Sequence, residues 1–210
     1  FGMTETSPLL TANPKNGIKK VGSIGIPLPS TRLKLVDLEI GETEVPQEQE
    51  GEIIAAGPQI MKGYYNNPEE TNIALREHVG ELWIHTGDVA RRDEDGFFFI
   101  VDRAKDMINV GGYKVFSTEV EHKLSQHPAI ELCAVFGVNN PNRSGSELVK
   151  LVVEKSKSGA DMPDESVRED ILVFAREKLA PYKVPKIVEF MKSIPLTSVG
   201  KVNKKALRKN

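Results

Sequence analysis

The chain has few of the features that cross-link a small protein with disulfides or anchor a protein in a membrane. Its 210 residues include one cysteine, Cys133, which excludes an internal disulfide and is typical of a reducing compartment. No apolar run approaches the ~20 residues that span a bilayer, and no signal peptide is visible. The formal net charge of −2 argues against a general nucleic-acid binder. We therefore expect a cytoplasmic protein with no transmembrane segment and no nucleic-acid partner.

Signatures of two common enzyme classes are also missing. No Gly-x-Gly-x-x-Gly follows a strand pattern and opens a helix, so a dinucleotide-binding oxidoreductase is disfavoured. The histidines at 78, 85, 122 and 127 show no ligand spacing with cysteines or carboxylates, so a metalloenzyme is not expected. We interpret His122 and His127 as helix-surface residues. Cys133 lies in an apolar run, which predicts a small core side chain.

Short apolar runs separated by turns rich in glycine and proline dominate the first half. They cover residues 21–24, 32–36, 52–56, 82–85 and 97–101. Their length and spacing predict a small, twisted β-barrel or sheet. One helix is expected to interrupt them after Asn67 and Pro68, because asparagine caps a helix and proline fits its first turn.

The second half alternates strand and helix patterns. Strands are predicted at 107–110, 113–116, 130–138, 148–154 and 187–190, and helices at 117–126, 164–179 and 204–209. Thr118 and Glu121 have the spacing of a capping box. The fold class is thus α+β. It comprises a β-barrel or sheet subdomain (1–104) and a C-terminal α+β domain (105–210), whose three-stranded sheet is covered by helices.

Four short segments are informative because of their order. They are Phe1-Gly-Met-Thr-Glu5, His85-Thr-Gly-Asp88, the stretch 101–116 with its glycine pair, and Pro195-Leu-Thr-Ser-Val-Gly-Lys201. In this order they resemble the adenylate-forming enzymes, the superfamily of acyl-CoA synthetases, aryl-CoA ligases, luciferases and peptide-synthetase adenylation domains. The resemblance runs along nearly the whole chain, and it is strongest to medium- and long-chain fatty-acid–CoA ligases.

The resemblance implies that the first half binds ATP and Mg²⁺. It assigns adenine stacking to Phe1, an α-phosphate contact to Thr4, Mg²⁺ to Glu5, both ribose hydroxyls to Asp88, and a second ribose or phosphate contact to Arg103. A carboxylate suits Mg²⁺, which prefers oxygen ligands, and it forms short charge-assisted bonds to hydroxyls.

Each of these segments also has a plainer interpretation. By its residues alone, the first segment is a terminal loop with a helix cap. The His85–Asp88 segment is equally a turn between strands. Arg103 has two acidic neighbours, Asp102 and Asp106, with which it can form a surface ion pair.

The second half is expected to supply the moving parts. The resemblance places a hinge at Lys105 and makes the C-terminal domain mobile. It assigns the glycine pair, Gly111 and Gly112, to a loop that lines the tunnel for CoA, with Tyr113 and Lys114 beside it. Glycine allows the close approach that such a loop needs. The same glycines also predict a hairpin turn, and the two interpretations are compatible.

Lys201 is the residue to which the resemblance gives a catalytic role. Acyl-adenylate formation presses a carboxylate onto an α-phosphate, so two anions must approach. One ammonium group about 4 Å away offsets roughly 4 kcal/mol of that repulsion at an effective dielectric of ~20. Without the resemblance, Gly-Lys at this point is an ordinary turn.

The family's Ser/Thr/Gly-rich phosphate loop, which ends in Pro-Lys, has no counterpart here, and Thr4–Pro8 lacks its glycines and lysine. We therefore expect the C-terminal part of an acyl-CoA synthetase that acts on a carboxylic acid, ATP and CoA. An upstream N-terminal region would be missing, and the chain alone would be inactive. The alternatives are an aryl-acid–CoA ligase, a carrier-protein-loading adenylation domain and a non-catalytic interaction module.

Overall fold

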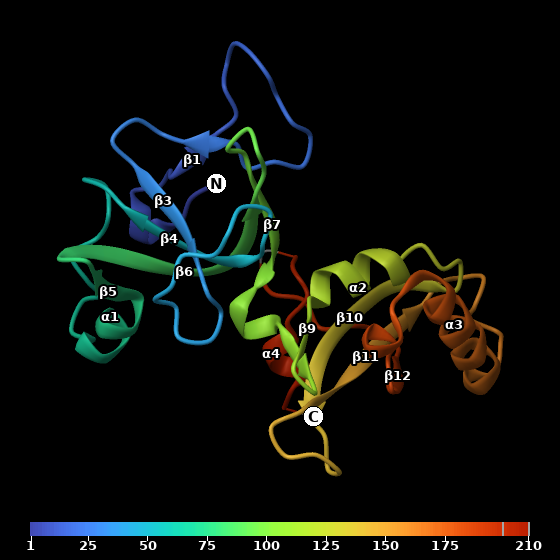
Figure 1. Ribbon diagram of the computed structural model, residues 1–210. Coiled ribbons are helices and arrows are strands. Elements are labelled where there is room, and N and C mark those ends of the chain that lie inside the picture. Colours follow the sequence, from blue (N-terminus) through green and yellow to red (C-terminus); the bar gives the residue numbers. More distant parts are fainter. Residues whose placement is uncertain (199, 210) are drawn as a thin grey trace. The chain divides into compact units, whose positions relative to one another are not determined.

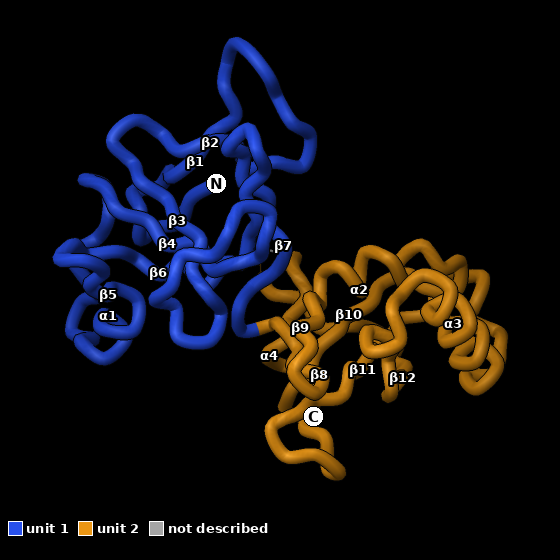
Figure 2. Tube along the Cα trace, in the orientation of Figure 1, with its two compact units in different colours: residues 1–105 blue, residues 106–210 orange. Residues whose placement is uncertain are grey.

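The computed structural model describes residues 1–198 and 200–209 and divides the chain into two compact units (Figures 1 and 2). Unit 1 comprises residues 1–105 and unit 2 residues 106–210. The join predicted from the sequence, between residues 104 and 105, lies one residue earlier. A short 3-10 turn, Ala104–Asp106, runs across it. The α+β class predicted from the sequence is confirmed, and each unit has its own core.

Unit 1 is built on a curled antiparallel sheet. Its strands are β3 (Arg32–Val36), β4 (Gly51–Ala56), β5 (Leu75–His78), β6 (Glu81–Arg92) and β7 (Phe98–Arg103). They follow the order β3-β4-β6-β5, and β7 also pairs with the long strand β6. A two-stranded ribbon, β1 (Thr11–Ala12) and β2 (Ile26–Pro27), and a short 3-10 turn at Thr4–Thr6 complete the unit with one helix, α1 (Pro68–Ala74).

Local sequence explains most of these elements. The side chain of Asn67 accepts a hydrogen bond from Glu70 N, so α1 begins at the predicted cap. On the sheet, Leu33, Leu35 and their neighbours face one core, whereas Val36 joins a second cluster on the other face, as expected for alternating strand positions. The predicted strand at 21–24 is wrong. Gly22 takes φ +80 in a turn that the chain makes there instead.

Unit 2 holds a three-stranded sheet with helices on both faces. Strand β10 (Ile130–Asn139) pairs antiparallel with β11 (Glu147–Lys155), and β12 (Ile187–Met191) pairs parallel with β11. A hairpin of β8 (Ile108–Val110) and β9 (Tyr113–Val115) precedes them. The helices are α2 (Ser117–Leu124), α3 (Asp164–Lys178) and α4 (Lys204–Leu207), and Pro181–Lys183 forms a 3-10 turn.

The helices of unit 2 cover the sheet according to the alternation of its side chains. Cys133 and Val135 of β10 pack with residues of α2 and α3, so the prediction that Cys133 is a core residue is confirmed. The intervening Ala134 and Phe136 pack with Leu207 of α4 on the opposite face. The sheet is therefore buried on both sides.

Two local predictions in unit 2 are wrong. Helix α2 begins at Ser117 with Phe116 as its N-cap, so Thr118 lies inside the first turn, and Glu121 accepts a hydrogen bond from Val135 N at 2.7 Å. His127 follows the end of α2 and is only 4% exposed. Its ring packs edge-on against Phe174 in α3. Local sequence did not reveal this long-range contact.

Candidate functional site

The first segment of the chain is a tight loop that is closed by its own atoms. The ring of Phe1 packs against the core of unit 1. A Cβ on Gly2 would lie 1.8 Å from the carbonyl oxygen of Pro8, so only glycine fits this close approach. The buried hydroxyl of Thr6 donates within the loop and accepts a bond from Met3 N at 3.1 Å. The loop leaves Thr4 exposed.

Glu5 in the same loop has a partner, Tyr64, that no local sequence pattern indicates. The Tyr64 hydroxyl donates to its carboxylate at 2.8 Å, and Met61 N donates to its backbone carbonyl at 2.9 Å. The hydrogen bond to Glu5, together with partial burial, raises the pKa of Tyr64. No motif pointed to Tyr64, because it lies 59 residues away along the chain.

Asp88 and Arg103 meet across neighbouring strands. They are register partners in the antiparallel pairing of β6 and β7, and Arg103 Nε lies 3.4 Å from Asp88 Oδ1. The Asp88 side chain is 16% exposed and that of Arg103 57% exposed. The ion pair expected for Arg103 is therefore present, but with Asp88. Asp106 instead binds Arg208 at 2.8 Å.

The glycine pair forms the two-residue turn of the β8–β9 hairpin, as the sequence predicted. Gly111 and Gly112 take φ +63 and +99, values that glycine adopts readily. Gly111 N donates to Ser146 Oγ, and Gly112 N donates to Asn109 Oδ1, both at 2.9 Å. The turn is thus held by side chains on both sides.

The two side chains that follow the glycine pair lie in different surroundings. Tyr113 stacks on Tyr182, with ring centroids 4.8 Å apart, and Lys114 is exposed. Arg143 from the β10–β11 loop lies over Gly111, where an added Cβ would approach its Nη1 to 2.4 Å. No sequence pattern predicted Arg143, Ser146 or Tyr182 here, because each reaches the hairpin from a distant segment.

Lys105, the predicted hinge, and Lys201, the predicted catalytic residue, are both exposed. Lys105 lies in the 3-10 turn at the join between the units. Lys201 ends a turn in which its backbone N–H donates to Thr197 Oγ1 at 3.1 Å and its carbonyl accepts from Thr197 N at 2.6 Å. Gly200 takes φ +78 in this turn. Val199 lies outside the described residues.

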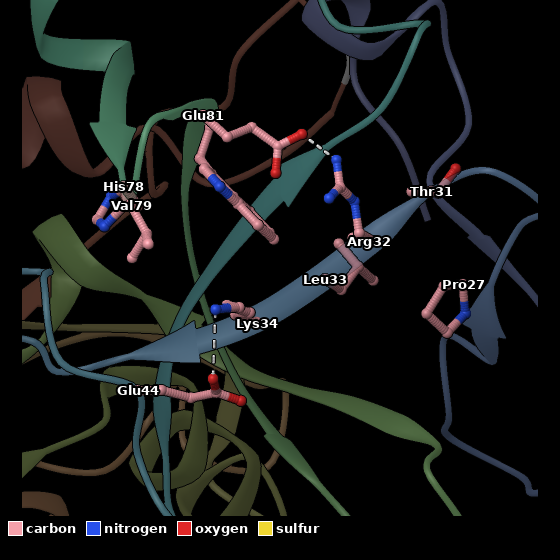
Figure 3. A pocket seen from close by; sticks show the side chains of 10 residues that line it. Pro27, Thr31, Arg32, Leu33, Lys34, Glu44, His78, Val79 and Glu81 are labelled. Carbon is pink, nitrogen blue, oxygen red and sulfur yellow. Dashed lines mark hydrogen bonds and ion pairs between the residues drawn. The ribbon is translucent and has the colours of Figure 1, made fainter.

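Unit 1 also has a groove of about 550 Å³ (Figure 3). Arg32 and Lys34 line it, and both lie over the ring of Trp83. Glu81 pairs with Arg32, and Glu44 lies 3.6 Å from Lys34. None of the predicted site residues lines this groove.

Over residues 1–198 and 200–209, no helix is long and apolar enough to cross a membrane, and no cluster of three or more His, Cys, Asp or Glu side chains could hold a metal ion.

A β-sheet unit with Asp88 beside Arg103, followed by a unit with a three-stranded sheet, helices and a glycine turn at 111–112, is what the resemblance to the adenylate-forming class predicts. The model for the AMP-binding enzymes matches residues 1–65, and the model for the AMP-binding enzyme C-terminal domain matches residues 119–201. The chain belongs to the AMP-binding enzyme family.

Two curated relatives and one solved structure illustrate the similarity. A long-chain-fatty-acid–CoA ligase from Bacillus subtilis (strain 168) is 46% identical over 99% of this chain and 35% of its own length. A feruloyl-CoA synthase from Amycolatopsis sp is 41% identical over 100% of this chain and 40% of its own. ATP-bound MatB from Rhodopseudomonas palustris is 33% identical with a TM-score of 0.84, over 99% of this chain and 39% of that one. The chain thus spans roughly two fifths or less of these relatives.

Proposed function

We propose that this chain forms the C-terminal part of an ATP-dependent acid–CoA ligase whose acid is a long-chain fatty acid. The observation that carries the proposal is the 46% identity to a long-chain-fatty-acid–CoA ligase over 99% of the chain. The acid and ATP would give an acyl-adenylate and pyrophosphate. The CoA thiol would then attack the acyl carbon, forming the thioester and releasing AMP.

In this proposal unit 1 carries the nucleotide contacts. Phe1 stacks on adenine, Thr4 contacts the α-phosphate, and Asp88 with Arg103 binds the ribose. The position of Arg103 beside Asp88, with Nε 3.4 Å from Oδ1, supports a shared ligand, because a guanidinium donates to ribose or phosphate oxygens and a carboxylate accepts from hydroxyl groups.

Glu5 is the residue proposed to bind Mg²⁺. It offers one carboxylate, hydrogen-bonded to Tyr64. Mg²⁺ retains several waters and is usually held by one or two carboxylates together with substrate phosphates, so a single glutamate fits an ion that arrives with ATP. The ion would neutralise phosphate charge there.

Unit 2 carries the parts proposed to act on the acyl group and the thiol. We assign residues 1–104 to the last subdomain of the large domain and 105–210 to a mobile C-terminal domain, with Lys105 as the hinge. Lys201 serves adenylation, while the hairpin with Gly111, Gly112, Tyr113 and Lys114 serves CoA. The exposure of Lys201 supports a side chain that reaches a partner outside its own turn. The buried free Cys133 suits a cytoplasmic location.

An aryl acid is the second candidate substrate. The observation that favours it is the 41% identity to a feruloyl-CoA synthase over the whole chain, and a crystal structure of an anthranilate CoA ligase with anthranoyl-AMP has a TM-score of 0.79 at 31% identity.

The test uses the full protein that contains this chain, with ATP, Mg²⁺ and CoA. We expect AMP and thioester formation with palmitate at a kcat/KM at least tenfold above that with ferulate. The reverse preference would replace the fatty acid by an aryl acid. A requirement for a phosphopantetheinylated protein in place of CoA would make the chain a carrier-loading domain. The 210-residue chain alone is expected to release no pyrophosphate, and turnover by it would contradict the proposal.

A further inference from the structure

Strand β6 is bulged where it carries Asp88. Glu52 of β4 pairs with Val89 of β6, and Ile54 pairs with His85. Three residues of β6, 86–88, therefore lie opposite the single residue 53 of β4. Such a bulge changes the direction in which the following side chain points. Gly87 makes it possible by taking φ +70.

The bulge is closed by a carboxylate from the neighbouring strand. Glu52 Oε1 accepts from Gly87 N at 2.9 Å, and Glu52 Oε2 lies 2.9 Å from His85 Nδ1. The Thr86 hydroxyl also stabilises the bulge. It donates to the carbonyl of residue 53 at 2.9 Å and accepts from Asp88 N at 3.2 Å. All four contacts involve the bulge or a residue next to it.

Glu52 is suited to this role because it stays charged while mostly buried. Its side chain is 15% exposed and that of His85 is 4% exposed. Burial favours the neutral acid, but the hydrogen bond and charge of His85, the Gly87 N–H and the charge of Arg76 outweigh it and lower the pKa of Glu52. His78 Nε2 lies 2.9 Å from His85 Nε2. His85 can therefore donate from Nδ1 to Glu52 while its other nitrogen is paired with His78.

We propose that Glu52 is a positioning residue for nucleotide binding, which holds the β6 bulge so that Asp88 faces the ribose. This inference rests on the proposed function, in which Asp88 binds the ribose hydroxyls. Glycine alone leaves the bulge free to take several backbone conformations. The two charge-assisted bonds of Glu52 select one of them, and such bonds are about twice as strong as neutral ones.

A purely structural role predicts a different outcome from a positioning role. If Glu52 only stabilised unit 1, its loss would lower the unfolding midpoint and the yield of active enzyme but would not change which nucleotide the enzyme prefers. If Glu52 acts through Asp88, its loss weakens the contacts to the ribose hydroxyls. ATP then loses its advantage over 2′-deoxy-ATP and 3′-deoxy-ATP, which lack one of those hydroxyls.

The test measures KM for ATP and for both deoxy analogues in the full protein that contains this chain. The variants are Glu52→Ala, Glu52→Gln, Asp88→Asn and the Glu52→Ala/Asp88→Asn double variant. We expect Glu52→Ala to raise the KM for ATP about tenfold to a hundredfold, with the KM for palmitate unchanged and the preference for ATP largely lost. Glu52→Gln keeps an oxygen for Gly87 N and should fall in between, which also covers the case in which the alanine variant fails to fold.

The double variant shows whether the two residues act together. Because Glu52 is proposed to act through Asp88, adding Glu52→Ala to Asp88→Asn should change KM less than threefold. Glu48→Gln is the matched control. It removes an exposed carboxylate that pairs with Arg91, also in β6, at 2.8 Å, and it should leave every KM unchanged.

Two failures can be told apart. If Asp88→Asn leaves the preference for ATP intact, Asp88 does not bind the ribose, and both the proposed nucleotide role and this inference are wrong. If Asp88→Asn abolishes the preference while both Glu52 variants retain it, or if the effects of Glu52 and Asp88 simply multiply, Asp88 keeps its role and only the inference about Glu52 is overturned.

Discussion

Replacing Lys201 by alanine in the full protein tests its proposed catalytic role with little expected effect on folding. The turn that ends at Lys201 is held by its backbone N–H and carbonyl, which bind Thr197 at 3.1 and 2.6 Å, and alanine retains both groups. The lysine side chain is exposed, and an exposed substitution of this kind changes stability by about 0.5 kcal/mol or less. The free energy of unfolding should therefore be nearly unchanged.

The expected loss of activity is much larger. An ammonium group about 4 Å from the approaching anions contributes roughly 4 kcal/mol at an effective dielectric of ~20. At 1.36 kcal/mol per factor of ten, removing it should slow acyl-adenylate formation about a thousandfold. Desolvation of the lysine reduces this figure, so we expect a loss between about a hundredfold and a thousandfold.

The assay follows the two half-reactions separately. Pyrophosphate release reports acyl-adenylate formation, and thioester formation from preformed acyl-AMP reports the second step, which should stay within about threefold of the unmodified protein. Lys192→Ala, which removes another exposed lysine of unit 2, is the control and should change neither rate. Pyrophosphate release by Lys201→Ala at the normal rate would refute the electrostatic role.

Three further predictions concern other parts of the two units. Gly112→Ala meets no atom within 4 Å but must adopt φ +99, so we expect a loss of about 1–2 kcal/mol in unfolding free energy and slower thioester formation with unchanged pyrophosphate release. Burial raises the pKa of Cys133 to about 12, so at pH 8 only about one thiol in ten thousand is ionised, and iodoacetamide labelling followed by mass spectrometry should detect it only after unfolding. Asp37 accepts bonds from five backbone N–H groups, chiefly those of Ile40 and Thr43, which lower its pKa. Asp37→Asn should therefore cost about 1 kcal/mol at pH 7 in urea denaturation, and the difference should shrink as the pH falls below about 4, where the unfolded carboxylate is protonated.

Periodicity predicted the regular elements well because they depend on local pattern. The strand expected at 32–36 is β3, and the one expected at 187–190 is β12 with one more residue. The predicted helix at 164–179 is α3 to within one residue. The strand predicted at 21–24 is absent because Gly22, between Val21 and Ile24, turns the chain at φ +80.

The candidate site was only partly predictable, and the reason is sequence distance. The resemblance singled out Asp88 and Arg103 as candidates, and the antiparallel register places them side by side. Tyr64 and Glu52 carry no motif that points to their partners. Glu52 lies 35 residues before Gly87, so only the pairing of β4 with β6 brings its carboxylate to the bulge. His127 was misjudged for the same reason, because its partners lie in α3.

The two candidate segments share one physical device, although they lie in different units. In each segment a glycine at positive φ donates its backbone N–H to a distant side chain. Gly87 N donates to Glu52 Oε1 on the neighbouring strand, and Gly111 N donates to Ser146 Oγ in the β10–β11 loop, both at 2.9 Å. A glycine lowers the cost of an unusual conformation but does not select it, since it also lowers the cost of the alternatives. The side-chain acceptor supplies the selection. A charged acceptor, as at Gly87, holds the backbone more firmly than the neutral hydroxyl at Gly111. That difference agrees with the proposed roles, in which Asp88 must stay fixed on a ribose while the hairpin must rearrange to admit a thiol.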